Sequence, residues 1–561
     1  MRNTRRQSFP RRGGIALVIA GLLVGAAACG GSDDGGSSEA GGEGGDAETL
    51  VFGTSADPVS LDPAYVSDGE SLRAARQIYE TLVTTEDGGT EIVPLLATSW
   101  EPSEDGKTWT FQLRDDVTFH DGTEFDAEAV CFNFDRWYNF EGVQQSPSVS
   151  YYWQTVFTGY ANNEDPELGE SLYSSCTAED ATTAVIELSQ ASASFLSGLA
   201  LASFSIASPT ALEEFGADEV SGSGEEPRFE GEYGNSVAVG TGPYELEAFE
   251  PNNRLVLTAY ENYWGEQPDV ETVIFRPIAD GAARKQALLS GEIQGYDLVD
   301  PADLASLEQA DYQLLERPAF NVGYVGINAS KPPLDNLKVR QAIAYALNKQ
   351  ALVTAKYPEG SEVAKEFMPP ELFGYSEQVP EYPYDPAKAK ALLAEAGVTN
   401  PTIEFWYPTN VSRPYMPQPE ANFQAFQADL EAAGFTVVPK SAPWNPDYLD
   451  AVNTGQAGLY LLGWTGDFGD PDNFIGTFFR TDQPAWGVIP DEIQAQLEAA
   501  RAESDQEVRA ALYEEINEAI MEYVPGVPYV HTSPRIVFAP NVTGYVPSPV
   551  SIEEFADVTL E

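Results

Sequence analysis

Segments with the hydrophobic pattern of strands alternate with segments of helical spacing in the second half of the chain. The predicted elements are a strand at 402–407, a helix at 420–433, a strand at 435–439 and a strand at 458–463. Strands that alternate with helices are typical of βαβ units, so this part of the chain is predicted to form a mainly parallel sheet.

The last of these strands runs directly into a turn rich in glycine and aspartate. The apolar run Leu459–Leu462 is followed by Gly463-Trp464-Thr465-Gly466-Asp467-Phe468-Gly469-Asp470-Pro471-Asp472-Asn473-Phe474. Open α/β sheets place ligands at the carboxyl ends of their strands, so Trp464 and the carboxylates of this turn are candidate ligand contacts. The alternative is a surface loop whose aspartates only cap turns.

The remainder of the chain has a mixed α/β pattern. Residues 94–114 show the strand, Asp-Gly turn and strand of a hairpin, and Asp126 is the expected N-cap of a helix that ends near Tyr138. Residues 140–235 have the least regular pattern. Further predictions are a long helix at about 336–355, a last helix at about 506–523 and strand-like residues at 527–538.

Length and charge limit the classes of protein that fit. The chain has 561 residues, too many for one core, and 43% of them are hydrophobic, so a globular protein of two or three domains is expected. The formal net charge is −58. Such a surface repels nucleic acid and anionic lipid, so neither is an expected partner. The alternative meaning of the charge is solubility or salt tolerance.

Residues 1–29 have the features of an export signal. A positively charged start precedes the short apolar run Ile15–Val24, and small residues then precede Cys29, as at a bacterial lipoprotein cleavage site. Cys29 is therefore the predicted lipid attachment point, with an ordinary secretory signal as the alternative. Residues 30–48 are nearly all Gly, Ser, Asp and Glu, the composition of a disordered tether. The signal does not distinguish Sec from twin-arginine export.

Two cysteines remain in the exported part of the chain. An even number of cysteines outside the cytoplasm favours a disulfide, here between Cys131 and Cys176. Two free buried thiols are the alternative.

Arg413 and Asp467 follow two of the predicted strands at comparable places. If those strands are parallel, both loops open at the same edge of the sheet. The planar guanidinium of an Arg suits a carboxylate, and an Asp suits an ammonium, so the pair fits a small zwitterion such as a short peptide. The alternative is that Arg413 and Asp467 pair with each other or with local acids.

Several segments together resemble one known family. They are 94–114, 117–122, 239–244, 263–265, 331–342, 384–393 and 463–474. In this order the chain resembles the peptide/nickel family of extracytoplasmic solute-binding proteins of ABC transporters, over almost its whole mature length. The resemblance implies two α/β lobes joined by a hinge, a periplasmic-binding-protein-like fold that encloses its ligand. The first lobe would comprise 49–318 plus 526–561, with an extra subdomain at about 100–235, and the second lobe 319–525.

The same resemblance implies function and residue roles. In the dipeptide-binding members, the positions of Asp467 and Arg413 hold the ligand's amino group and its carboxylate. Trp464, Tyr415 and Phe468 are candidates for the pocket wall. The implied protein is a lipid-anchored, extracytoplasmic monomer that captures small peptides, dipeptides foremost, and delivers them to a membrane permease. A separate ATPase would power import, since no Gly-x-x-x-x-Gly-Lys-Ser/Thr loop occurs in this chain. Residues 140–235 depart from the dipeptide-binding pattern, which leaves side-chain selectivity open.

Other cargoes and another class of protein compete with this hypothesis. Within the family the ligand can be a longer oligopeptide, an oligosaccharide, haem or a nickel chelate. No cofactor and no metal site are expected, because His120 and His531 are the only histidines and lie far apart in sequence. A secreted hydrolase using Asp467 and Asp470 is the enzyme alternative. No Gly-x-Ser-x-Gly or His-Glu-x-x-His motif supports it.

Overall fold

The computed structural model describes residues 48–561, except 167, 225 and 551–552 and the side chains of 445–446. The predicted export signal, the lipid attachment point Cys29 and nearly all of the tether lie outside the described residues. Within the described part of the chain, no helix is long and apolar enough to cross a membrane.

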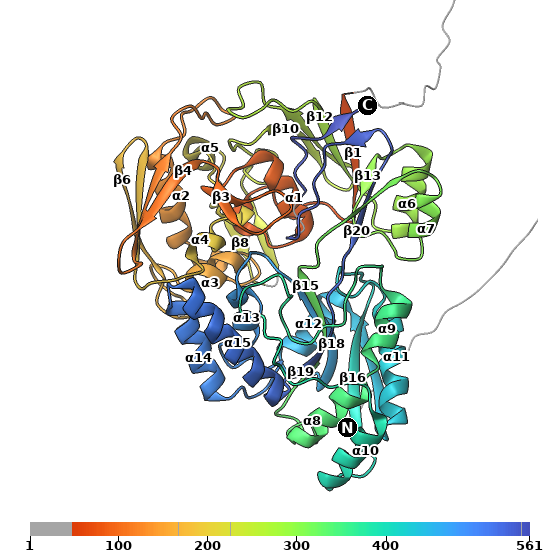
Figure 1. The fold of residues 1–561 in the computed structure, drawn as a ribbon. Coiled ribbons are helices and arrows are strands. Elements are labelled where there is room, and N and C mark those ends of the chain that lie inside the picture. The colour runs from red at the N-terminus through yellow and green to blue at the C-terminus, as the bar shows by residue number, and fades with distance from the viewer. Residues whose placement is uncertain (1–47, 167, 225, 551–552) are drawn as a thin grey trace, which may run out of the picture. The chain divides into compact units, whose positions relative to one another are not determined.

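Seven strands form the larger sheet, in the order β10-β11-β12-β1-β13-β20-β14 (Figure 1). They are β1 (Thr49–Thr54), β10 (Tyr244–Glu250), β11 (Arg254–Ala259), β12 (Thr272–Pro277), β13 (Gly295–Tyr296), β14 (Gln313–Glu316) and β20 (Arg535–Phe538). Strand β1 runs parallel to β12 and β13, and the other pairs are antiparallel. Helix α1 (Gly69–Ile78) shares a buried apolar cluster with β1 through Ala74, Ala75 and Ile78, which packs the carboxyl half of α1 against this sheet.

A four-stranded antiparallel sheet, β4-β5-β7-β6, is the core of a smaller unit in the first half of the chain. Its strands are β4 (Ala97–Pro102), β5 (Thr108–Leu113), β6 (Tyr173–Asp180) and β7 (Thr183–Leu188). Strands β4 and β5 form the predicted hairpin. Helix α2 (Ala127–Tyr138) begins after the predicted N-cap Asp126 and packs on this sheet. A disulfide joins Cys131 of α2 to Cys176 of β6.

Five strands form the second sheet, in the order β17-β16-β18-β15-β19. They are β15 (Asn321–Ile327), β16 (Thr402–Thr409), β17 (Thr436–Pro443), β18 (Leu459–Thr465) and β19 (Gly526–Val530). Strand β16 runs parallel to both β17 and β18, so the predicted parallel part of the sheet is confirmed. Strand β15 is antiparallel to β18 and β19, which makes the complete sheet mixed.

Helices cover this second sheet and extend beside it. They are α8 (Leu337–Ala346), α9 (Lys349–Lys356), α10 (Pro386–Glu395), α11 (Pro419–Ala432), α14 (Asp491–Ala502) and α15 (Gln506–Tyr523). Helices α14 and α15 pack against each other (Figure 1). The prediction of one long helix at 336–355 is wrong, because the chain breaks between α8 and α9. There Asn348 leaves the helical conformation and its side chain accepts a hydrogen bond from the backbone N–H of Ala351, at 3.1 Å.

The chain passes between the two large sheets twice, and the two crossing segments are hydrogen-bonded to each other. Between β14 and β15, Arg317 donates its backbone N–H to the carbonyl of Pro534 at 3.0 Å. Asn321 donates its side-chain amide to the carbonyl of Thr532 at 2.9 Å and accepts the Thr532 N–H at 3.0 Å. We call the part built on the seven- and four-stranded sheets the first lobe, and the part built on the five-stranded sheet the second lobe.

The lobe boundaries 318/319 and 525/526 remain a prediction, and the sheet to which one strand belongs departs from the second boundary. Strand β19 pairs with β15 in the second sheet, so the chain rejoins the first sheet only at β20. The strand-like run predicted at 527–538 is thus two strands in two different sheets. All of β19 is buried, and so are the three apolar residues that follow Arg535 in β20, so the sequence pattern alone does not separate the two strands.

Candidate ligand-binding site

A cavity of about 920 Å³ is lined by residues of both lobes. The first lobe contributes the amino end of α1, the tyrosines of α3 (Tyr151–Phe157) and Leu298. The second lobe contributes the end of β18 with the turn that follows, residues 413–415 and residues 477–486. A volume of this size is in the range of small-molecule and peptide sites.

Strand alternation explains which side chains of the second sheet reach the cavity. Successive residues of a strand point to opposite faces, so Tyr460, Leu462 and Trp464 of β18 share one face. Tyr324 of β15 lies opposite Leu462 in the antiparallel register and belongs to the same face. All four residues line the cavity, so this face of the sheet forms its wall.

Asp467 lies two residues beyond the end of β18, at the cavity. Its carboxylate accepts hydrogen bonds from the Tyr152 hydroxyl of the first lobe at 2.8 Å and from the Asn473 amide at 3.1 Å. The Asp467 backbone N–H donates to the Asn473 side-chain oxygen at 2.8 Å. Asp467 is therefore fixed from its own lobe by Asn473 and contacted from the other lobe by Tyr152.

The environment of Asp467 disfavours its charged form. Burial raises the pKa of Asp467 from 3.8 to about 6, although the hydrogen bonds from Asn473 and Tyr152 oppose that shift. The carboxylate is half-buried, and its accessible surface belongs to the cavity lining. No cation offsets its charge among the residues that the structure describes. A half-buried carboxylate without a cation suits a cationic ligand group.

Arg413 lies beyond the end of β16 and also lines the cavity. Its backbone is paired with Met416 in a tight turn, and its guanidinium lies over the Trp444 ring, 4.7 Å from the ring centre. The parallel pairing of β16 and β18 brings the loops after both strands to one edge of the sheet, as predicted. In the described part of the chain neither Arg413 nor Asp467 forms an ion pair, so the structure does not show the two paired with each other.

The other two aspartates of the turn are engaged in buried ion pairs. Asp470 accepts two hydrogen bonds from the Arg509 guanidinium, at 2.8 and 2.9 Å. Asp472 pairs with Arg480 at 2.7 Å and lies 3.8 Å from Arg501. The Asp470 carboxylate is thus held by an arginine, which leaves it poorly suited to the hydrolytic role considered from the sequence.

The aromatic candidates fall in two different places. Trp464 and Tyr415 line the cavity. Phe468 does not: it is 4% exposed and belongs to the buried apolar cluster of the first lobe, although it is carried by a loop of the second. The next residue, Gly469, lies so near the first lobe that a Cβ there would be 2.7 Å from the Thr90 Cβ.

Sequence reasoning missed three residues of the site. Tyr152 lies in the irregular region 140–235, where the aromatic run Tyr151-Tyr152-Trp153 was the available signal. Asn473 lies in the turn rich in glycine and aspartate, where no sequence pattern marks it as a partner of Asp467. Trp444 begins the helical turn Trp444–Tyr448 that precedes helix α12 (Leu449–Asn453), and no sequence pattern marks it as a neighbour of Arg413.

His531 is buried and His120 is partly buried, and both are bonded to backbone oxygens. His120 Nε2 lies 3.0 Å from the Gly242 carbonyl oxygen, and His531 Nδ1 lies 2.7 Å from that of Asn321. Burial lowers the pKa of each to about 4. No group of three or more His, Cys, Asp or Glu side chains in the described ranges is arranged to hold a metal ion.

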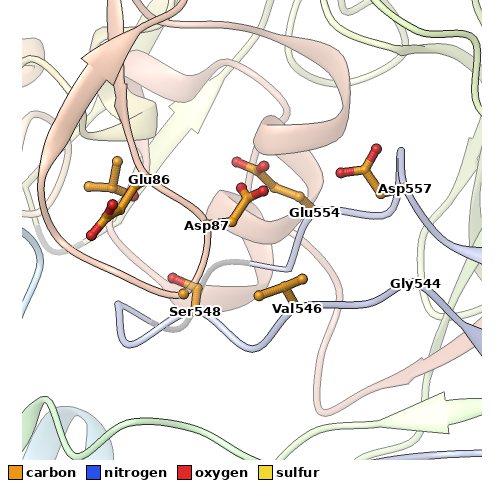
Figure 2. A pocket seen from close by; sticks show the side chains of 9 residues that line it. Glu86, Asp87, Gly544, Val546, Ser548, Glu554 and Asp557 are labelled. Carbon is orange, nitrogen blue, oxygen red and sulfur yellow. The ribbon is translucent and has the colours of Figure 1, made fainter.

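A second, much smaller pocket of about 40 Å³ lies in the first lobe (Figure 2). Its lining includes Glu86, Asp87, Glu554 and Asp557. Burial raises the pKa of Glu554, and the negative charges of Asp87 and Asp557 raise it further, against Arg76. The pocket is too small for a peptide and repels anions, so the large cavity is the candidate site.

A family model of bacterial extracellular solute-binding proteins, family 5 Middle, matches residues 91–486. This chain belongs to that family. It is 34% identical to the dipeptide-binding protein of Escherichia coli (strain K12), over 92% of this chain and 95% of that protein. It is 32% identical to heme-binding protein A of Haemophilus influenzae, over 91% of this chain and 92% of that protein.

Solved structures agree with the family. An ABC transporter-associated periplasmic binding protein from Helicobacter pylori, in complex with the peptide STSA, superimposes with a TM-score of 0.77 at 29% identity. The match covers 91% of this chain and 98% of the other. The predicted two-lobed α/β fold of the solute-binding proteins is thereby confirmed.

Proposed function

We propose that this solute-binding protein captures small peptides, dipeptides foremost, in the cavity between its lobes and delivers them to an ABC permease. The observation that carries the proposal is the pair of ionisable groups at one sheet edge. Asp467 has no neighbouring cation, and Arg413 has no carboxylate partner among the described residues. A zwitterionic ligand supplies both missing partners.

Each end of a peptide has a residue suited to it. The ammonium binds the Asp467 carboxylate, and the peptide carboxylate binds the Arg413 guanidinium, which is held over Trp444. Hydrogen bonds between charged groups contribute about 1.5–3 kcal/mol each. Trp464 and Tyr415 supply apolar wall between the two charges.

Closure of the lobes follows from where these contacts lie. The hydrogen bond from Tyr152 to Asp467 joins the first lobe to the second at the ammonium site. A ligand that contacts both lobes binds the closed form better than the open form and shifts the population towards it. The closed form then docks on the permease, whose separate ATPase powers import.

Attachment and location are part of the same proposal. A lipid at Cys29 anchors the protein to the outer side of the bacterial cell membrane, and residues 30–48 tether the two-lobed body to it. The protein acts as a monomer and has no catalytic role. Its relatives are solute-binding proteins, which is consistent with a non-enzyme.

Haem is the second candidate ligand, because a relative that covers 91% of this chain is named a heme-binding protein. The propionates of haem can bind Arg413 but leave Asp467 without a cation. A neutral oligosaccharide leaves both charges unpaired. The arrangement of charges therefore favours a peptide over either.

Calorimetric titration of the mature chain with di-, tri- and pentapeptides and with haem tests the proposal. We expect micromolar or tighter Kd values for dipeptides, loss of binding to N-acetylated dipeptides, and loss in both the Asp467→Ala and Arg413→Ala variants. Binding of longer peptides alone would keep the family and reject the two-charge site. Binding of haem alone would replace the peptide as ligand.

A further inference from the structure

The wall that the first lobe contributes to the cavity has more carboxylates than cations. Its charged lining residues are three acids and one base, which we call the acidic wall: Asp68, Glu70, Asp297 and Arg73. Arg73 donates a hydrogen bond to Glu70, and its guanidinium also lies 3.3 Å from the Asp297 carboxylate. A single guanidinium therefore serves two carboxylates, and the third carboxylate has none.

The buried layer behind the acidic wall does not remove this excess charge. Glu553 is fully buried and accepts a hydrogen bond from Arg73 at 2.5 Å. Glu553 also pairs with Arg317, whose guanidinium lies 3.3 Å from the Asp297 carboxylate. This layer adds one carboxylate and one guanidinium, so the wall keeps an excess of two negative charges.

Two other positive groups near the wall do not balance it either. The amino end of α1 supplies about half a positive charge. Arg284 of α6 (Gly281–Ser290) lies near Asp297, but it donates to the Ile278 carbonyl at 2.7 Å and is accompanied by the carboxylate of Asp280. More than one negative charge of the wall is therefore left without a counter-charge in the empty cavity.

Asp68 is the carboxylate of the wall that can accept a ligand cation. It is the N-cap of α1, where its Oδ1 accepts a hydrogen bond from the Ser71 backbone N–H at 3.0 Å. Asp68 is half-buried and forms no ion pair with any residue that the structure describes. Burial raises the pKa of Tyr152 well above its usual range, and the negative charges of Asp467 and Asp68 raise it further, so both carboxylates lie near this tyrosine.

The second lobe offers no counter-charge to the acidic wall. Arg413 and Asp467 are the only Asp, Glu, Lys or Arg residues that the described part of this lobe contributes to the cavity lining. In the proposed function both are used by the two ends of the peptide. A peptide with neutral side chains therefore leaves the excess charge of the wall as it was, and an acidic side chain increases it.

We propose that this protein prefers short peptides that carry a lysine or arginine side chain, and that Asp68 accepts a hydrogen bond from its cationic group. The inference rests on the proposed function, because Asp467 and Arg413 must hold the peptide ends for a third charge to face the wall. Leu72 and Leu298 are partly exposed lining residues of the first lobe and can cover the aliphatic stem of such a side chain. The ligand class is a short peptide with a net positive charge.

Calorimetric titration of the mature chain at pH 7 tests this inference with Ala-Ala, Lys-Ala, Ala-Lys, Glu-Ala, Ala-Glu and two norleucine peptides, Nle-Ala and Ala-Nle. Norleucine has the stem of lysine without the ammonium, so the comparison isolates the charge. We expect lysine in at least one position to bind about tenfold more tightly than norleucine there, which is the value of a weak charge-assisted hydrogen bond. Both glutamate peptides should bind more weakly than Ala-Ala, and the lysine-to-norleucine ratio should fall at high salt.

The Asp68→Asn variant tests the residue and keeps the helix cap, because an asparagine oxygen also accepts the Ser71 N–H. It is expected to bring the Kd values of the lysine and norleucine peptides within about twofold of each other. Asp126→Asn is the matched control. Asp126 is the half-buried N-cap of α2 and accepts the Ala129 N–H at 2.9 Å, but it does not line the cavity. This control should keep the wild-type ratio.

The possible failures are distinguishable. Equal binding of lysine and norleucine peptides at both positions would leave the two-charge site standing and overturn the preference for a basic side chain. A lysine preference that is unchanged in Asp68→Asn would overturn the role of Asp68. Absence of binding for every dipeptide would overturn the proposed function, and this inference with it.

Discussion

Lowering the pH from 7 to 5 is expected to weaken peptide binding about tenfold, because the empty site takes up a proton on Asp467. Burial raises the pKa of this carboxyl from 3.8 to about 6 in the ligand-free chain. A protonated carboxyl presents no charge to the peptide ammonium. Binding below pH 6 must therefore displace a proton, and the free energy of that displacement is subtracted from the affinity.

The magnitude follows from the size of the shift. One pH unit below the pKa, about ten molecules in eleven carry the proton, whereas at pH 7 only about one in eleven does. The ratio corresponds to about 1.4 kcal/mol. The peptide's own ends do not change between pH 5 and 7, since an α-amino group titrates near 8 and an α-carboxyl near 3.5. The change in affinity therefore reports Asp467.

The same shift affects the stability of the ligand-free chain. The folded pKa of Asp467 is above the unfolded value, so the folded form binds the proton more tightly. The contribution of Asp467 to stability is fully present below pH 3.8, falls as the pH rises to about 6, and is constant above that. The loss is at most about 3 kcal/mol, reduced by solvent that reaches the cavity. Asp467→Asn should therefore raise the unfolding free energy at pH 7 while abolishing dipeptide binding.

Titration calorimetry at pH 5 and 7 is the assay, with two buffers of different ionisation enthalpy at each pH. We expect release of about 0.9 proton per peptide bound at pH 5 and about 0.1 at pH 7. Thermal unfolding at both values controls for loss of structure. A Kd that stays constant from pH 7 to pH 5, in a chain that remains folded, would refute the assignment of the ammonium to a carboxyl of raised pKa.

Three further predictions address other parts of the molecule. Arg413→Ala should weaken dipeptide binding about 10- to 150-fold, as measured by calorimetry. Amidating the dipeptide's carboxyl terminus should weaken its binding to the wild-type chain by the same factor, but should not weaken its binding to the Arg413→Ala variant any further. Replacing both Cys131 and Cys176 by serine should lower the unfolding free energy by about 4 kcal/mol, because the disulfide joins residues 45 positions apart, and should leave the peptide Kd unchanged. Denaturant unfolding tests this prediction, and an unchanged unfolding midpoint would contradict it. Phe468→Ala should lower the packing free energy between the lobes by about 3–5 kcal/mol, so the ligand-free chain should be more open in small-angle scattering and should bind peptide more weakly. Phe468→Leu should restore most of the compactness and most of the affinity. Unchanged scattering and affinity in Phe468→Ala would count against a role of Phe468 in closure.

The central part of the second sheet was predictable because its pattern is local. The alternation of strand and helix between 402 and 465 specifies parallel neighbours, and the structure has β16 beside both β17 and β18. Once these strands are parallel, Arg413 and Asp467 must share an edge. Strands β15 and β19 were not placed, because an apolar strand buried on both faces pairs equally well in either direction as judged from its sequence.

The contacts between lobes could not be predicted for a different reason. Tyr152 reaches Asp467 from 315 residues away, and Phe468 enters the cluster of the other lobe from a glycine-rich turn with no periodicity. Apolar spacing reports which face of a regular element is buried. It contains no information on where a single loop side chain is buried, which depends on how two separately folded cores meet.

Three aspartates within six residues show most clearly what the fold adds to the sequence. Asp470 has Arg509 of α15, and Asp472 has Arg480 with Arg501 of α14 nearby, so both carboxylates are neutralised inside the protein. Before folding, any of the three could have been the ligand contact, because their arginines lie up to 39 residues further along the chain. Asp467 differs only in having hydrogen bonds from neutral groups and no cation. The free-energy cost of burying the Asp467 charge is therefore not offset until a ligand brings an ammonium. For this reason Asp467, which of the three carboxylates contributes least to the stability of the empty chain, is the one best suited to bind a ligand.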